Sequence, residues 1–223
     1  MVERVLILGG TAEAAALAAE RVAAGDDVTT SLAGRTKEPR PLAGRVRSGG
    51  FGGAAGLARY LRDGGFDHLI DATHPFASHI SRNAAEAARL AGVRLTVRER
   101  PPWTPHPDDL WDEVASLREA AASLGGGTRV LLALGSQHLS AFAARADVHF
   151  VVRMIDRPEA PLALPDHTLV LGRPSRDPSA EAAMLREHRV ERIVCRNSGG
   201  SGAYAKLVAA RQLRLPVSMV ARP

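Results

Sequence analysis

The stretch that decides the fold is V-L-I-L-G-G-T-A-E-A, residues 5–14. Four aliphatic residues are followed by Gly9, Gly10 and Thr11, and then by a run rich in alanine. A short apolar strand, a glycine turn and a helix in this order are typical of the first unit of a doubly wound parallel sheet. Glycines let the backbone approach a phosphate, and the helix start offers unpaired N–H groups. The full G-x-G-x-x-G pattern is absent, so the stretch alone also fits a purely structural turn.

Strand-like and helix-like segments alternate along the rest of the chain. The expected strands are 4–8, 27–32, 45–47, 68–71, 94–97, 129–134, 148–154, 168–171, 192–195 and 217–220. The expected helices are 12–24, 54–62, 76–91, 110–124, 137–144, 179–188 and 203–213. This alternation predicts α/β architecture with mostly parallel sheets that are covered by helices on both faces.

A proline-rich stretch, Glu99–Asp109, interrupts the alternation with four prolines and marks a domain boundary. We therefore expect two Rossmann-like domains, residues 1–98 and 99–223. The first would bind the cofactor, and the second would complete a cleft in which cofactor and substrate lie between the domains.

The composition favours an anionic small molecule as the partner. The chain has 223 residues and a formal net charge of +5, and its 29 basic residues include only two lysines. Arginine grips carboxylates and phosphates in a bidentate way. A GC-rich genome would produce the same bias without any functional reason, and nucleic acid is a weaker alternative because no nucleic-acid-binding motif is present.

Other classes of protein receive little support from the sequence. The single cysteine, Cys195, cannot form an internal disulfide, and the eight histidines show no metal-ligand spacing. No nucleophile elbow of the G-x-S-x-G type is present. The first apolar run is too short for a signal peptide or a membrane span. We expect a cytoplasmic protein that binds no metal.

The segment after the second strand, S-L-A-G-R-T (residues 31–36), bears on cofactor choice. NAD-specific sheets place an acid near this point to bind the ribose 2′-hydroxyl. Here Ser31, Arg35 and Thr36 take its place, and these side chains suit the 2′-phosphate of NADPH. The alternative is that Arg35 is an ordinary solvated loop residue.

Two further segments follow strands of the first half. S-G-G-F-G-G, residues 48–53, is so rich in glycine that it indicates either backbone pressed against a ligand or a tight bend. D-A-T-H-P-F, residues 71–76, places Thr73 and His74 at the switch-point crevice, with Pro75 stiffening the turn. A lone histidine such as His74 is more often structural than catalytic.

The second half repeats this arrangement at two strand ends. L-G-S-Q-H, residues 134–138, ends a strand in a polar turn before a helix. C-R-N-S-G-G-S-G-A-Y-A-K-L, residues 195–207, is the richest segment and carries Asn197, Tyr204 and Lys206. A flexible surface loop is the structural alternative for this segment.

Together these segments resemble the precorrin-6A reductases of the cobalamin pathway. The matching stretches are I-L-G-G-T-A-E-A, A-G-R-T, G-G-F-G-G-A-A-G-L, D-A-T-H-P-F-A-x-x-I-S-x-N-A, R-N-S-G-G-x-G-A-Y-x-K-L and the C-terminal L-P-V-x-M-V-x-R-P. The resemblance runs from residue 5 to the end of the chain. It implies an NADPH-dependent enzyme with two Rossmann-like domains that reduces one double bond of precorrin-6A to give precorrin-6B.

On this basis we assign residues to the two ligands. The cofactor residues are Gly9, Gly10 and Thr11 at the pyrophosphate, Arg35 and Thr36 at the 2′-phosphate, and Gly50, Phe51, Gly52, Gly53, Thr73, His74 and Pro75 on the nicotinamide side. Glu13 is also assigned to the cofactor. The residues assigned to the carboxylates of the acidic tetrapyrrole are Ser136, Gln137, Arg196, Asn197, Ser198, Gly199, Gly200, Tyr204 and Lys206. His74 is expected to orient the reactants.

Three rival interpretations stay open at this point. The first is an NADPH-dependent reductase of another acidic small molecule, and the second is a nucleotide-sensing module without chemistry. The third is a basic nucleic-acid binder. The partners would be the tetrapyrrole and, transiently, neighbouring enzymes of the pathway. The sequence does not identify the proton donor.

Overall fold

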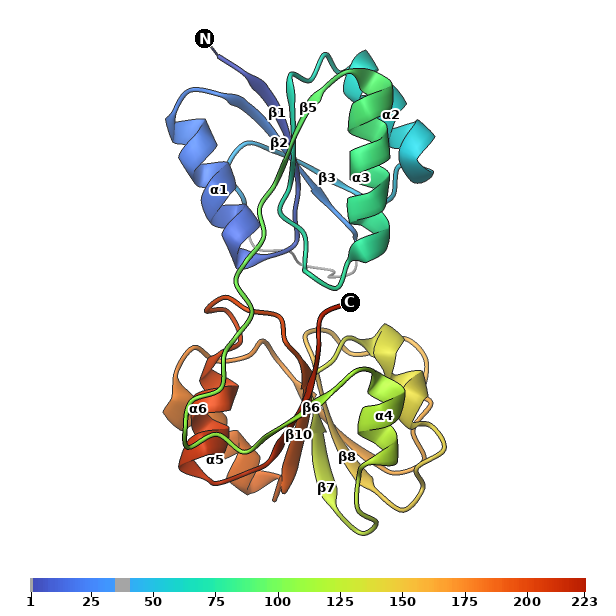
Figure 1. Ribbon diagram of the computed structural model, residues 1–223, viewed down its shortest axis with the longest axis vertical. Coiled ribbons are helices and arrows are strands. Elements are labelled where there is room, and N and C mark those ends of the chain that lie inside the picture. The colour runs from blue at the N-terminus through green and yellow to red at the C-terminus, as the bar shows by residue number, and fades with distance from the viewer. Residues whose placement is uncertain (1, 35–40) are drawn as a thin grey trace. The chain divides into compact units, whose positions relative to one another are not determined.

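The computed structural model describes residues 2–34 and 41–223. The chain divides into two compact units, of which the first extends to Arg100 and the second runs from Pro101 to Arg222. The division falls within the proline-rich stretch that follows the fifth strand (Figure 1).

The first unit is built on a five-stranded, all-parallel sheet with the strand order β3-β2-β1-β4-β5. Its strands are β1 (Arg4–Leu8), β2 (Asp27–Leu32), β3 (Arg45–Ser48), β4 (His68–Asp71) and β5 (Arg94–Val97). Its helices are α1 (Ala12–Ala23), α2 (Gly53–Asp63) and α3 (Ser78–Ala91). This is the Rossmann strand order 3-2-1-4-5-6 without its sixth strand.

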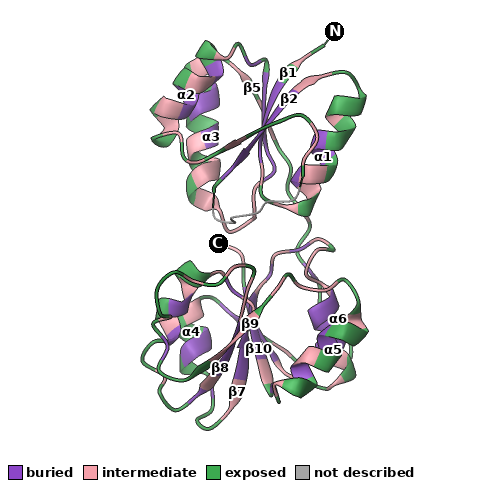
Figure 2. Cartoon of the chain, turned by 180° about the vertical axis from the view of Figure 1, so that it is seen from behind, coloured by how far each residue is buried: buried purple, intermediate pink, exposed green. Residues whose placement is uncertain are grey.

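The apolar run of β1 is buried on both faces because helices cover both sides of the sheet. Val5 and Ile7 pack with α1 on one face, whereas Leu6 and Leu8 pack with α2 and α3 on the other. Figure 2 shows the central strands as the buried part of this unit. β1 ends at the glycine turn, and Thr11 directly after the glycines is the N-cap of α1.

The second unit is built on a six-stranded, all-parallel sheet with the strand order β6-β11-β10-β7-β8-β9. Its strands are β6 (Trp111–Val114), β7 (Arg129–Leu132), β8 (His149–Met154), β9 (His167–Leu171), β10 (Arg192–Arg196) and β11 (Val217–Val220). Its helices are α4 (Leu117–Ala122), the 3-10 helix η1 (Ser136–Phe142), α5 (Pro178–Glu187) and α6 (Ala205–Gln212). The expected α/β class is confirmed, and both sheets are entirely parallel.

The core of the second unit also lies on both faces of its sheet. A large cluster that includes Trp103, Leu131, Ile193 and Leu207 packs between the sheet and helices α5 and α6. On the other face, η1 packs against β8 through two phenylalanines, Phe142 and Phe150, whose ring centroids lie 5.6 Å apart.

The helix expected over residues 110–124 forms only in the second part of that range, and the prediction is wrong for the first part. Trp111–Val114 forms the edge strand β6, which pairs in parallel with β11, and the helix α4 begins only at Leu117. The hydroxyl of Ser116 accepts a hydrogen bond from Glu119 N (3.1 Å). The Glu119 carboxylate in turn accepts one from the backbone N–H of Ala115 (2.8 Å). This capping box starts the helix late. The polar residues that precede this helix adopt the strand conformation because they pair with β11.

The other differences are smaller. The helix expected over 137–144 is a 3-10 helix, Ser136–Phe142, and the strand expected over 129–134 ends at Leu132. Helix α3 begins at Ser78, two residues later than expected, because the turn after Pro75 precedes it.

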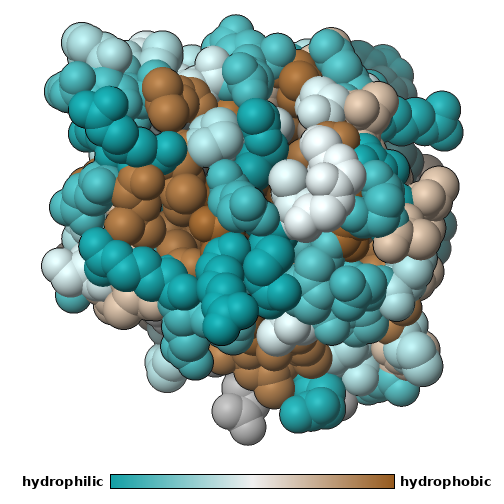
Figure 3. Space-filling model, turned by 90° about the horizontal axis from the view of Figure 1, so that it is seen from below, coloured by the Kyte–Doolittle hydropathy of each residue, from teal (hydrophilic) through white to brown (hydrophobic). Residues whose placement is uncertain are grey.

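In the parts of the chain that the structure describes, no helix combines the length and the apolar character needed to cross a bilayer. Figure 3 shows one face of the molecule, on which polar side chains surround separate hydrophobic patches. Exposed apolar side chains such as Val46, Leu110 and Leu171 occur singly in the sequence. Single exposed residues of this kind are ordinary on folded proteins.

Candidate active site

The first candidate site lies at the carboxyl edge of the first sheet, where its strands end. The chain order reverses between β1 and β4, which are neighbours in the sheet. Such a switch point is the usual ligand position in an open α/β sheet. The turns Gly9–Thr11 and Thr73–Pro75 follow these two strands, so the structure brings these expected cofactor residues together.

Thr11 holds the two turns to each other. Its hydroxyl donates to Ala72 O (3.0 Å) and accepts from Ala14 N (3.0 Å). The single hydroxyl hydrogen is therefore used within the protein, and any contact of Thr11 with a phosphate would use its backbone N–H. Gly9 packs tightly here, because a Cβ at its position would lie 2.8 Å from Thr30 Cγ2. Gly10 has φ +103° and faces open space.

Glu13, in the first turn of α1, forms an ion pair. Arg100 Nη1 lies 2.9 Å from Glu13 Oε2, and the arginine side chain is 14% exposed. A carboxylate near a helix start would repel a phosphate. The partly buried guanidinium offsets that charge, so the start of α1 stays compatible with an anion.

The D-A-T-H-P-F segment forms a rigid turn after β4. Asp71 is buried, and its Oδ1 accepts from Thr73 N (3.0 Å) and from the Thr73 hydroxyl (2.7 Å). His74 Nδ1 accepts from Phe76 N (3.2 Å), so a neutral His74 ring carries its hydrogen on Nε2. The side chains that the sequence placed at the crevice are thus fixed by their own turn.

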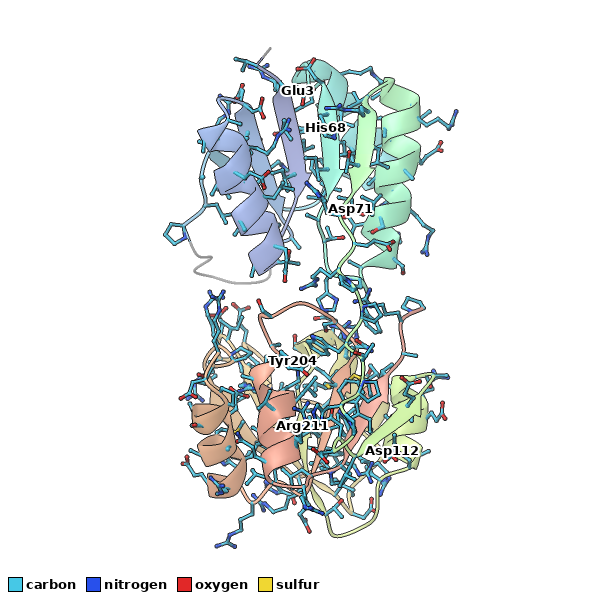
Figure 4. The ribbon with its side chains drawn as sticks, turned by 60° about the vertical axis from the view of Figure 1, so that its left-hand side comes forward. Glu3, His68, Asp71, Asp112, Tyr204 and Arg211 are labelled. Carbon is cyan, nitrogen blue, oxygen red and sulfur yellow. The ribbon has the colours of Figure 1, made fainter. Side chains whose placement is uncertain are left out.

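A second group of titratable side chains lies away from this turn, as Figure 4 shows. Asp71 lies at the carboxyl end of β4, whereas His68 and Glu3 lie near the amino end of the sheet. The hydrogen bond from Arg21 lowers the pKa of Glu3, and burial lowers the pKa of His68. This second group is an ion-pair network remote from the switch point.

The glycine-rich loop after β3 is organised by Arg47. Its Nη1 donates to Gly49 O (3.0 Å), and its Nη2 donates to Gly50 O (3.1 Å). Its guanidinium carbon lies 3.9 Å from the centre of the Phe51 ring, a cation–π contact. The ring of Phe51 in turn meets Tyr60 edge-on, with centroids 5.2 Å apart.

The strand order places the two segments assigned to the nicotinamide on different flanks of β1. Gly50–Gly53 follows β3, on the far side of β2, whereas Thr73–Pro75 follows β4 on the other side. Three strand spacings of about 4.8 Å put roughly 14 Å between these strand ends. The structure therefore does not bring the two segments to one flank. Arg35 and Thr36, expected at the 2′-phosphate, lie outside the described residues.

The second candidate site lies at the carboxyl edge of the second sheet. The chain order reverses between β7 and β10, and the polar turns after these strands are neighbours. Ser136 and Gln137, both exposed, follow β7, and Arg196 ends β10. Arg196 Nη1 lies 2.9 Å from His138 Nε2, which joins the two turns. The expected substrate residues of these turns are therefore brought together.

The loop after β10 is built around Trp103, which lies within the proline-rich stretch Glu99–Asp109. The side-chain amide of Asn197 accepts from Trp103 N (2.7 Å) and donates to Trp103 O (2.9 Å). The Trp103 indole N–H donates to Gly200 O (2.7 Å). Gly199 has φ +65°, and a Cβ there would lie 2.2 Å from Pro101 O. Asn197 is buried and holds the loop in place, while Ser198 N bonds back within it, to the carbonyl of Arg196 (2.7 Å).

Tyr204 and Arg211 lie one above the other on the α6 segment (Figure 4). Arg211 donates to both carboxylate oxygens of Asp109 (2.8 and 3.2 Å) and to the Tyr204 hydroxyl (3.4 Å). Burial would raise the pKa of Asp109, but the hydrogen bonds from Arg211 and from His106 N, together with the charge of Arg211, outweigh burial and leave this pKa lowered. The network anchors the polar end of Tyr204.

Lys206, which the sequence assigned to the substrate carboxylates, is buried. Its Nζ donates to Ala203 O (2.7 Å) and lies 4.7 Å from the centre of the Trp103 ring. Burial lowers the pKa of Lys206, and it raises the pKa of the neighbouring thiol of Cys195. The ammonium thus supports the Trp103 loop from inside the second unit.

An open pocket of about 440 Å³ lies beside this loop. Its lining includes three prolines, two aromatic rings and one cationic side chain, Arg176. The lining residues are Pro101, Pro102, Trp103, Arg176, Pro178, Gly200, Ser201, Tyr204, Ala205 and Val208. Across residues 2–34 and 41–223, no group of three or more His, Cys, Asp or Glu side chains is placed to hold a metal ion.

Sequence reasoning missed several residues that shape these sites. Trp103 contacts Asn197 across 94 positions, and Arg100 contacts Glu13 across 87 positions. Contacts this distant leave no local pattern. Arg47 had a usable signal, since a cation directly before a glycine-rich loop can bind the loop's carbonyl groups.

A family model and several curated relatives each match nearly the whole length of the chain. A family model described as "Precorrin-6x reductase CbiJ/CobK" matches residues 4–223. The precorrin-6A reductase of Rhodococcus erythropolis is 48% identical over 223 residues, 99% of this chain and 89% of the relative. That of Rhodobacter capsulatus is 45% identical over 99% of this chain and 88% of the relative. The cobalt-precorrin-6A reductase of Salmonella typhimurium is 30% identical over 98% and 87%.

A solved structure described as "CobK precorrin-6A reductase" has the same fold. It superimposes with a TM-score of 0.96 at 45% sequence identity, and the match covers 100% of this chain and 89% of that chain.

Proposed function

From the premise that the chain belongs to the CbiJ/CobK family of precorrin-6x reductases, we propose NADPH as its hydride donor and the two carboxyl edges as its binding sites. The enzyme is an oxidoreductase of cobalamin biosynthesis that reduces precorrin-6A. The family implies a nicotinamide cofactor and a precorrin substrate. The choice of NADPH over NADH and the residue assignments are our proposal.

The turn at Gly9–Thr11 is the observation that carries the cofactor assignment. It stands at the switch point, and it leads into the N-terminus of a 12-residue helix. Gly10 faces open space there, so a ligand can reach the backbone. The first N–H groups of α1 have no partner inside the helix, and together with the helix dipole they favour a pyrophosphate. Arg100 offsets the nearby charge of Glu13.

When bound, NADPH would supply a hydride to one carbon of the macrocycle. The chain's own work is to hold the reactants in register. In our proposal the Asp71-supported turn presents His74 and Pro75 toward the nicotinamide, with the ring fixed by Phe76 N. Arg47, Phe51 and the glycines around it would contact the adenosine side, which is the flank on which β3 lies.

The second carboxyl edge is proposed to hold the acidic substrate. Arg196 and His138 form a polar junction there, and the pocket beside Trp103 offers one cation and an aromatic wall. Precorrin-6A carries several carboxylates on a large conjugated ring. Cationic and aromatic surface side by side suits such a molecule.

Anaerobic incubation of the enzyme with NADPH and precorrin-6A tests the proposal. Mass analysis should show a product heavier by two hydrogen atoms, and NADPH should be consumed in equal amount. NADPH consumption with no reduced macrocycle, or a macrocycle reduced equally well by NADH, would contradict it.

A parallel arm should use cobalt-precorrin-6A, because three relatives of this chain are described as reductases of that compound. We expect the metal-free substrate to be preferred, since relatives described as precorrin-6A reductases are more similar to this chain. Binding of NADPH without turnover of either compound would favour the nucleotide-sensing alternative.

A further inference from the structure

The ends of β2 and β3 carry a guanidinium whose partners within residues 2–34 and 41–223 are all neutral. Arg47 is the direct register partner of Ser31, and its Nη1 donates to the Ser31 hydroxyl at 2.7 Å. Its other hydrogen bonds go to the carbonyls of Gly49 and Gly50. Among the described side chains, no carboxylate lies within ion-pair distance of Arg47, whereas Arg45 on the same strand pairs with Asp27.

The position of this pair in the fold has a known chemical meaning. In a Rossmann sheet, the residue at the carboxyl end of the second strand faces the adenosine ribose, and NAD-specific proteins place an acid there for the 2′-hydroxyl. Ser31 occupies that strand end here and is buried. A neutral hydroxyl linked to a guanidinium replaces the acid. The carboxylate that would accept from a ribose 2′-hydroxyl is therefore missing, and the guanidinium supplies donors for a phosphate.

The guanidinium is also held in a defined plane. Its carbon lies 3.9 Å from the centre of the Phe51 ring and 5.2 Å from that of Tyr60. Arginine has five N–H donors, and three are used by the contacts to Ser31, Gly49 and Gly50. Two donors, that on Nε among them, have no partner among the described residues. A stacked, oriented guanidinium with unused donors is well suited to a phosphate.

We propose that Arg47, held by Ser31 and Phe51, binds the 2′-phosphate of NADPH and is a determinant of the preference for NADPH over NADH. This inference rests on the proposed function, because it takes the first carboxyl edge as the cofactor site. It adds a specificity residue that the sequence pattern did not single out.

The test measures binding of two adenosine fragments to the full chain by calorimetry, without turnover. Adenosine 2′,5′-bisphosphate carries the 2′-phosphate, and adenosine 5′-monophosphate lacks it. We expect Arg47→Gln to weaken the bisphosphate by about tenfold to a hundredfold, as expected for loss of a charge-assisted hydrogen bond. Binding of the monophosphate should stay within about twofold. Arg47→Lys should recover part of the loss because it restores the charge.

Arg45→Gln is the matched control, since Arg45 lies on the same strand and faces Thr29 at the other end of the β2 pairing. It should leave both fragments unchanged. Equal weakening of both fragments in Arg47→Gln would mean that Arg47 only shapes the glycine loop, and no weakening would exclude it from the site. Either result overturns the inference. If the unaltered enzyme itself bound both fragments equally, the NADPH proposal would fail and this inference with it.

Discussion

Asn197 and Trp103 form a reciprocal pair in which one side-chain amide satisfies both backbone polar groups of a residue 94 positions away. The amide oxygen of Asn197 accepts from Trp103 N at 2.7 Å, and the amide nitrogen donates to Trp103 O at 2.9 Å. Both residues are buried. The pair ties the entry of the second unit to the loop after β10.

We expect Asn197→Ala to destabilise the second unit by about 2–4 kcal/mol, because it leaves a buried N–H and a buried C=O of Trp103 without partners. Urea unfolding followed by tryptophan fluorescence measures this directly, since both tryptophans of the chain, Trp103 and Trp111, lie in the second unit. Ser201→Ala, at an exposed position of the same loop, should change stability by less than about 0.5 kcal/mol. A similarly small change for Asn197→Ala would show that the pair contributes little.

The buried ammonium of Lys206 should make stability depend on pH in the alkaline range. Burial lowers the pKa of Lys206 in the folded state, whereas an unfolded lysine keeps a pKa of about 10.4. Between these two values the unfolded chain binds more protons, so the free energy of unfolding should rise with pH. The penalty for burying the charge is thus largest below the folded pKa and disappears toward the unfolded one.

Lys206→Met isolates this effect because it removes the charge and keeps an unbranched side chain that is only one atom shorter. We expect the difference in unfolding free energy between the unaltered enzyme and the variant to shift in favour of the unaltered enzyme as pH rises toward 10. Both proteins should carry Cys195→Ala, because burial raises the pKa of this thiol and the charge of Lys206 acts on it, so the thiol would not titrate alike in the two proteins. A difference that did not change with pH would show that the ammonium is solvated.

The limits of sequence-based prediction follow from where each contact is made. The strand and helix bounds of the first unit were predicted nearly to the residue, because its apolar runs end at glycine turns. The conformation of segment 110–124 was not predicted correctly. Its first part becomes a strand only by pairing with β11, about a hundred residues later in the chain. Local composition carries no trace of that partner.

The candidate site shows the same division. The turns at Gly9–Thr11, Thr73–Pro75 and Arg196–Gly200 could be placed at sheet edges because each follows a predicted strand. The burial of Lys206 could not be predicted, since it depends on the Trp103 ring lying over the start of α6. The contact between Ser31 and Arg47 could not be predicted either, because it depends on the register in which β2 and β3 pair.

Arg196 should contribute to substrate capture at the second carboxyl edge. We expect Arg196→Gln to raise KM for precorrin-6A by about threefold to tenfold, equivalent to roughly 0.7–1.4 kcal/mol, and to leave KM for NADPH nearly unchanged. Arg192→Gln is the matched control, because Arg192 lies at the other end of the same strand and contacts Asp112 and Ser218. Equal effects of the two variants would remove Arg196 from the site.

We expect KM for precorrin-6A to depend on ionic strength, because substrate capture relies on charge. The chain has a formal charge of +5, and the substrate is a polyanion. Screening shortens the reach of such a field from about 10 Å at 0.1 M salt to about 3 Å at 1 M. KM for precorrin-6A should therefore rise with salt in the unaltered enzyme and rise less steeply in Arg196→Gln. A KM independent of salt would indicate that the excess of arginine is compositional only.

His74 should orient the reactants and should not act as the proton donor. Its Nδ1 accepts from Phe76 N at 3.2 Å, a contact that requires this nitrogen to stay unprotonated. The hydrogen bond therefore favours the neutral ring, and Pro75 stiffens the turn that presents it. An essential general acid would contribute roughly 10²–10⁴-fold to the rate. Asparagine can place its side-chain oxygen near the position of Nδ1 and keep the bond to Phe76 N.

We therefore expect His74→Asn to lower kcat by about tenfold or less, the equivalent of roughly 1.4 kcal/mol. The pH–rate profile should keep its shape, because no titration of His74 would contribute to it. His79→Asn is a suitable control, since His79 is exposed on α3 and should leave both kcat and the profile unchanged. A loss above about a thousandfold, or the disappearance of an ionisation between about pH 6 and 7, would identify His74 as a general acid. The Phe76 contact would then have to break during turnover, because a protonated ring cannot accept that hydrogen bond.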